Sequence, residues 1–173
     1  MKSFEVNGNL EDEKDFDIFL DSIVKTKEVF NNTFGIDVMS KIDLYVDNAT
    51  EMSGYTPITT VILKKYIIIK LGIKDFSRVE QTIYQFAHEL CHYVFYSLKG
   101  LDKPKADSEE ENICSAMSLI LIKILCPDKI DGWVTYVNNL SNENYNKGGK
   151  IAMDCNFDIN VLKDKIYKLC DKC

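Results

Sequence analysis

The chain has 173 residues, of which 46% are hydrophobic and 28% charged, so it is long enough for one domain with a buried core. Its formal net charge of −6 argues against a general nucleic-acid binder, because such a protein needs a basic face to neutralise phosphates. Arg78 is the only arginine, which leaves almost no scope for bidentate phosphate clamps.

The N-terminal sequence and the cysteine content together indicate where in the cell the protein is located. The first residues turn acidic at Glu11 without an apolar run, and no later stretch is apolar enough to span a bilayer. The six cysteines are scattered, unlike the dense framework of a small secreted domain. We therefore expect a cytoplasmic protein with mostly reduced cysteines and no membrane partner. The oligomeric state stays open.

The N-terminal half is expected to hold one helix followed by strands. Apolar residues recur with helical spacing over residues 12–34, and the pattern stops before Gly35. Residues 42–46 alternate as a half-buried strand, and residues 54–57 resemble a turn. The β-branched runs at 59–63 and 66–71 predict two strands or one long one.

The second half is expected to be helical. We predict helices at about 76–98 and 108–125, the second ending before Pro127. Further helices are expected at 130–140 and 159–170, with a polar loop around 142–150. Strands before helices indicate an α+β fold.

We expect one domain over residues 1–173. Its predicted parts are an N-terminal helix with strands (1–75), the catalytic helices (76–126) and a C-terminal helical part (127–173).

His88 and His92 are the only histidines, and they lie four residues apart in the predicted helix 76–98. That spacing puts both side chains on one helical face, where two neutral imidazoles can bind one zinc ion. Glu89 lies one step round the helix and can reach a metal-bound water as a general base. An apolar stripe containing Phe86 and Leu90 marks the opposite, core-facing side. The pattern predicts a zinc hydrolase.

A third ligand is expected from Glu109, Glu110 or Glu111. A structural role is also open to them, because Ser108 followed by acidic residues is typical of a capping box. The loop before residue 108 gives the chain room to turn and bring this second helix beside the first. Glu111 follows His92 after eighteen intervening residues.

This arrangement resembles the gluzincins, zinc peptidases with two histidine ligands and one glutamate ligand. The resemblance covers about residues 66–125 and implies a zincin-like fold, a small sheet followed by the active-site helix and a Glu-bearing helix. It implies His88, His92 and Glu111 as ligands and Glu89 as general base. The small intracellular zincins that cleave regulatory proteins are similar too, and in that branch Glu110 would replace Glu111.

Other residues are weaker candidates for a role. A peptidase needs a group that stabilises the oxyanion. Tyr136 and Tyr145, in the C-terminal region, are candidates for this role. The strand 66–71 or its neighbour can offer an open edge to an extended peptide. Cys91 is expected near Cys114 if the two helices pack together. The spacing of Cys170 and Cys173 at the C-terminus is interpreted as incidental.

Two functions are therefore compared. The first is zinc-dependent hydrolysis of a peptide or protein substrate. The second is a zinc-binding regulatory or interaction module that keeps a peptidase-like fold with little or restricted turnover.

Overall fold

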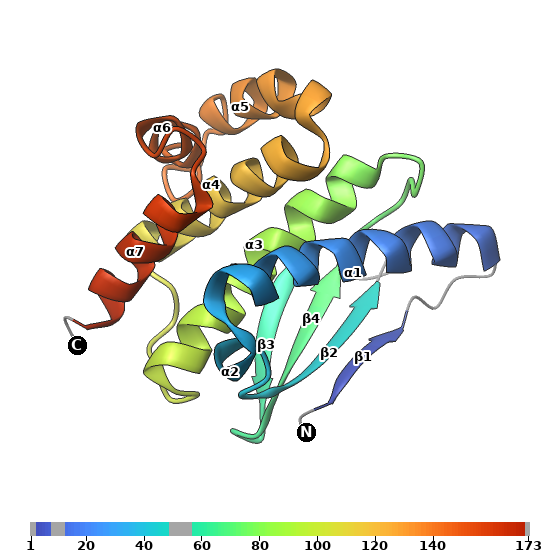
Figure 1. The fold of residues 1–173 in the computed structure, drawn as a ribbon, viewed down its shortest axis with the longest axis vertical. Helices are drawn as coiled ribbons and strands as arrows, with labels where there is room; N and C mark the ends of the chain where they lie inside the picture. Colours follow the sequence, from blue (N-terminus) through green and yellow to red (C-terminus); the bar gives the residue numbers. More distant parts are fainter. Residues whose placement is uncertain (1–2, 8–12, 49–56, 172–173) are drawn as a thin grey trace.

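The computed structural model describes residues 3–7, 13–48 and 57–171, and its fold is a mixture of α and β structure. Four strands form one sheet in the order β1-β2-β4-β3 (Figure 1). β1 and β4 run parallel to β2, and β3 is antiparallel to β4. The strands are β1 (Phe4–Asn7), β2 (Asp43–Asn48), β3 (Ile58–Ile62) and β4 (Tyr66–Leu71).

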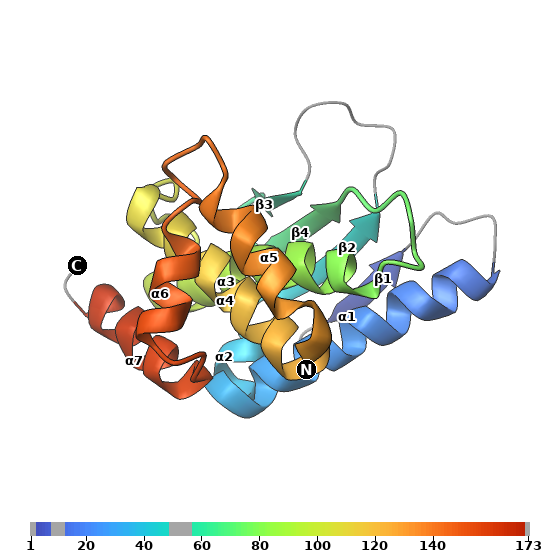
Figure 2. The ribbon, with the colours of Figure 1, turned by 90° about the horizontal axis from the view of Figure 1, so that it is seen from above.

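Seven α-helices lie within the described residues, with one 3-10 turn at Pro127–Lys129. Figure 2 shows the sheet along one side of the molecule and the helices on the other. The predicted α+β class is confirmed. The helices are α1 (Glu13–Phe34), α2 (Ile36–Met39), α3 (Val79–Lys99), α4 (Ser108–Leu125), α5 (Ile130–Asn138), α6 (Gly148–Asp154) and α7 (Ile159–Cys170).

The sheet is covered on one face by α1 and α3. Alternate residues of β2 and β4, such as Leu44 and Ile69, are buried, whereas the residues between them are half-buried. This two-residue period is what a strand with one core-facing side requires. None of the helices in the described segments has the length and apolarity needed to cross a membrane.

Helix α3 lies in the centre of the molecule, with the sheet on one side and a second layer of helices on the other. Of that second layer, α4 packs against α3. Its expected apolar stripe is confirmed, since Ile83, Phe86, Leu90 and Val94 are at most 3% exposed. Helix α4 is buried over 112–122, so apolar packing fixes how α4 sits against α3.

The predicted helices 12–34 and 108–125 are confirmed at nearly the same boundaries, the first from residue 13. The runs 59–63 and 66–71 form two strands, because the chain turns between them with Leu63 and Lys64 at φ of 51° and 53°. The expected turn at 54–57 lies outside the described residues, apart from Pro57.

Four elements were not predicted: β1, α2, the 3-10 turn at Pro127–Lys129 and α6. Helix α6 begins with two glycines inside the segment predicted as a polar loop. At Gly148 an added Cβ would lie 2.5 Å from Ser115 Cβ and 3.1 Å from the Ala116 nitrogen. The glycine therefore lets α6 approach the backbone of α4 more closely than any side chain would allow.

We expect Gly148→Ala to lower the free energy of unfolding by about 1–3 kcal/mol, because the new methyl group overpacks the contact with α4. Gly132→Ala in α5 is the matched control, since an added Cβ there meets no atom within 4 Å. It should be neutral or stabilise by up to about 1 kcal/mol. Urea denaturation measures both, and equal effects would contradict the close-approach explanation.

Candidate metal centre

One face of α3 forms the floor of a cleft. Tyr84, His88, His92 and Tyr96 recur every four residues, so their side chains lie in a row along the helix. All four line a cleft with a volume of about 830 Å³. Glu89, Glu111 and residues 57–61, which include most of β3, also line it, as do Lys103, Lys105, Ala106, Tyr136, Leu140 and Tyr145.

Three ligand atoms converge in the middle of this row. His88 Nε2 lies 3.0 Å from Glu111 Oε2, and His92 Nε2 lies 3.3 Å from the same oxygen. Ligands placed tetrahedrally around zinc at usual bond lengths are about 3.3 Å apart. The group of two imidazoles and one carboxylate thus has the donor chemistry and spacing to hold a metal ion.

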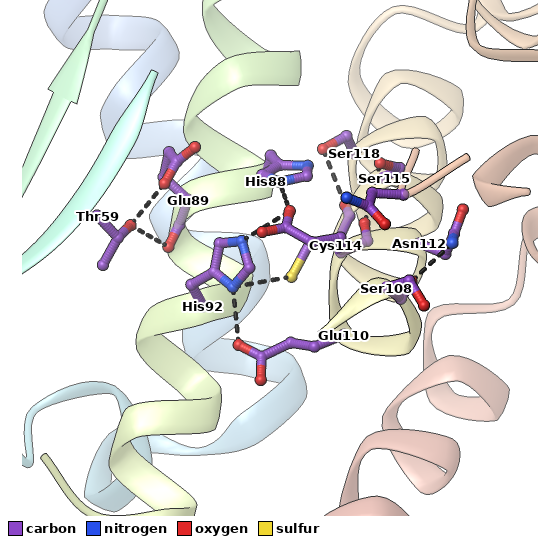
Figure 3. Close-up of polar contacts among 12 residues, drawn as sticks. Thr59, His88, Glu89, His92, Ser108, Glu110, Asn112, Cys114, Ser115 and Ser118 are labelled. Carbon is purple, nitrogen blue, oxygen red and sulfur yellow. Dashed lines mark hydrogen bonds and ion pairs between the residues drawn. The ribbon is translucent and has the colours of Figure 1, made fainter. Parts of the chain in front are cut away.

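Glu110 supports the group without joining it. Its Oε1 accepts a hydrogen bond from His92 Nδ1 at 2.8 Å (Figure 3). A proton on Nδ1 leaves the Nε2 lone pair free for a metal, and this is the usual partner of a ligating histidine. The thiol of Cys114 lies 3.5 Å from the same Nδ1.

Lys103 holds Glu110 in place. Its Nζ lies 2.9 and 3.0 Å from the two carboxylate oxygens and 3.2 Å from the Pro104 carbonyl oxygen. The Lys103 side chain is 3% exposed and its ammonium group sits over the Tyr96 ring. A buried carboxylate needs such a partner, because desolvation of an unpaired charge is costly.

Glu89 faces the cleft but does not belong to the ligand group. Thr59 on β3 places its Oγ1 2.7 Å from Glu89 Oε2 and 3.1 Å from the Glu89 carbonyl oxygen. Thr59 shares the core-facing side of the sheet with its register partner Ile69. This contact orients the carboxylate and links the edge of the sheet to α3.

His92 and Glu111 form an ion pair, with Nε2 of His92 3.3 Å from Oε2 of Glu111. Burial by itself lowers the pKa of His92, but hydrogen bonds to Glu110 and Glu111 outweigh it and raise the pKa to about 10. Burial likewise raises the pKa of Glu111, yet hydrogen bonds from His88 and His92 lower it to about 2. At neutral pH the pair therefore carries a proton on His92, and a metal must displace it.

Of the two candidate tyrosines, Tyr145 is closer to the histidines. Its ring centroid is 5.7 Å from that of His88, and burial raises the pKa of its hydroxyl, with further contributions from Glu111 and Glu89. Tyr136 also lines the cleft, but the residue is 55% exposed.

The structure brings together the predicted residues His88, His92 and Glu111, and it gives Glu110 a supporting contact instead. Glu109 is exposed. The expected cap at Ser108 is wrong, because Asp107 Oδ1 accepts the hydrogen bond from the Glu110 nitrogen.

Cys91 contacts Cys114 across the helix pair, as expected. Cys173 lies outside the described residues. The sequence does not mark Thr59, Lys103 and Asn112 as site residues, because no short-range pattern connects them to the histidines.

The chain was compared with known proteins by sequence and by structure. No protein-family model, no curated protein and no solved structure matches it.

Three consecutive glutamates allow a matched test of the ligand set. We expect Glu111→Gln to reduce zinc affinity most, because it removes a ligand charge. Glu110→Gln should weaken zinc binding by about 10- to 100-fold through the loss of support for His92. Glu109→Gln, at an exposed position, should leave affinity unchanged. Competition with a chromophoric chelator measures all three, and equal affinities would contradict this assignment.

Zinc binding should release about one proton near pH 7.5, because His92 is protonated in the metal-free protein and must bind as neutral imidazole. Below pH 10 the affinity for zinc should therefore increase with increasing pH, by up to about tenfold per pH unit. Titration calorimetry in two buffers of different ionisation enthalpy measures the proton count. An affinity independent of pH would be inconsistent with the ion pair.

Proposed function

We propose that the protein is a zinc-dependent peptidase of gluzincin type with a zincin-like fold. The observation that carries the proposal is the position of Glu89. This carboxylate lies one residue from His88, outside the ligand group, and faces the same cleft. A purely structural metal site has no use for such a group, whereas hydrolysis needs a base beside the metal.

His88, His92 and Glu111 would hold one zinc ion. Two nitrogens and one oxygen are a donor set that suits zinc, and three protein ligands leave a position open, as catalytic zinc sites do. When bound, zinc supplies a Lewis acid and lowers the pKa of a coordinated water to near neutrality.

Glu89 then acts as general base and general acid. Its carboxylate accepts a proton from the nucleophilic water and afterwards donates that proton to the leaving amine. Thr59 holds Oε2 of this carboxylate, so the other oxygen is free for the water. The Tyr145 hydroxyl is suited to donate a hydrogen bond to the oxyanion that develops on the attacked carbonyl.

The shape of the cleft favours an extended peptide as substrate. From Tyr84 to Tyr96 the row on α3 spans about 18 Å, which matches about five residues of extended chain. Across the cleft, β3 pairs with β4 on one side and has no second strand neighbour among the described residues. On that side the backbone groups of β3 can pair with an extended peptide, with little dependence on the peptide's sequence.

Glu89→Gln should retain zinc, because residue 89 is not a ligand, and should lose essentially all turnover, because the amide cannot accept the proton. Cleavage of a mixture of quenched fluorescent peptides of random sequence measures turnover, and elemental analysis measures zinc. Glu80→Gln, on the same helix but outside the cleft, is the control and should behave as wild type.

Undiminished hydrolysis by Glu89→Gln would refute the assigned base. Stoichiometric zinc in the wild type without cleavage of any peptide would instead favour the second function, a zinc-binding regulatory module.

A further inference from the structure

Asn112 directly follows Glu111 in α4 and is 4% exposed. Its side-chain amide makes three hydrogen bonds. Nδ2 donates to the Ser108 carbonyl oxygen at 2.6 Å and to that of Glu143 at 3.2 Å. Oδ1 accepts from the Lys147 nitrogen at 2.8 Å. One buried side chain therefore joins α4 to two points of the loop before α6.

These two points bracket Tyr145, since they lie two residues before and two residues after it. Between them the loop folds on itself: the Tyr145 nitrogen donates to the Asn142 carbonyl oxygen at 3.0 Å, and the Tyr145 carbonyl oxygen accepts from Gly148 at 3.1 Å. The backbone of Tyr145 is thus tied to α4 on both flanks.

Three successive residues near the start of α4 hold three parts of the site. Glu110 contacts His92, Glu111 completes the ligand group, and Asn112 holds the loop that carries Tyr145. Successive residues of a helix point about 100° apart, so one rigid turn presents these side chains in three directions. The 5.7 Å separation of the Tyr145 and His88 rings is then set by the same turn that places Glu111.

We propose that Asn112 is a positioning residue that holds Tyr145 beside the metal centre. An apolar side chain would fill the same space but leave the Lys147 nitrogen and the Glu143 carbonyl oxygen without this partner, and the loop would lose its attachment. The inference rests on the proposed metal centre and on the role proposed for Tyr145, but it does not require that a peptide substrate be known.

A double-mutant cycle tests the inference with acetohydroxamate as the probe, because its oxygens occupy the place of a developing oxyanion at a metal. The full chain is loaded with Co²⁺, whose visible spectrum reports metal binding and hydroxamate binding separately. Tyr145→Phe should weaken hydroxamate binding by about five- to tenfold, the effect of one hydrogen bond. Asn112→Ala should weaken it similarly, and the double variant no further than Tyr145→Phe alone.

Amide hydrogen exchange supplies a second measurement that does not depend on the metal. Exchange at Lys147 should accelerate in Asn112→Ala and stay unchanged in Tyr145→Phe, because only the first change removes the acceptor. Asn32→Ala, at an exposed position of α1, should match the wild type in both assays. If Asn112→Ala does not bind cobalt, the cycle is run with Asn112→Asp, which keeps the acceptor and loses both donor bonds.

Additive losses in the double variant, or an unchanged affinity in Tyr145→Phe, would overturn the inference while leaving the metal centre intact. A wild-type protein without the cobalt spectrum would refute the metal centre itself, and the inference with it.

Discussion

The packing of α4 against α3 is the contact on which the site depends. Neither helix alone carries all three potential metal ligands, because His88 and His92 lie on α3 and Glu111 on α4. Apolar burial along α3 and over 112–122 of α4 drives the contact and fixes the rotation of each helix. The polar atoms at the start of α4 are placed by that packing.

This placement buries several charges together. Lys103, Glu110, His92 and Glu111 form a connected chain of ion pairs and hydrogen bonds, with side chains between 3% and 20% exposed. Desolvation opposes such a chain, and its hydrogen bonds offset that cost only while every member is present. The arrangement fixes the positions of the Nε2 atoms of His88 and His92, and it also stabilises a proton on His92 that would compete with a metal ion.

The local part of the site was predictable, because His88 and His92 need only the four-residue repeat of one helix. The choice between Glu110 and Glu111 was not predictable, because both lie in one helical turn. Which of them faces the histidines depends on how α4 is rotated about its own axis when it packs against α3. Thr59 and Asn112 act across long sequence separations, which leave no periodic signal. Helix α6 was missed because Gly148 disfavours a helix locally and is explained only by its approach to α4.

Thr59 gives the edge of the sheet a direct connection to the chemistry proposed for Glu89. Among the described strands it belongs to the one at the edge of the sheet, which we propose pairs with a peptide, and its hydroxyl contacts the carboxylate that would move the proton. A hydroxyl has one proton, so Thr59 donates to Glu89 Oε2 or to the Glu89 carbonyl oxygen at any moment. A peptide paired to β3 would lie on the strand whose hydroxyl contacts this base. Substrate alignment and proton transfer would then be coupled through a single hydrogen bond, which rigid elements on both sides of the cleft can transmit.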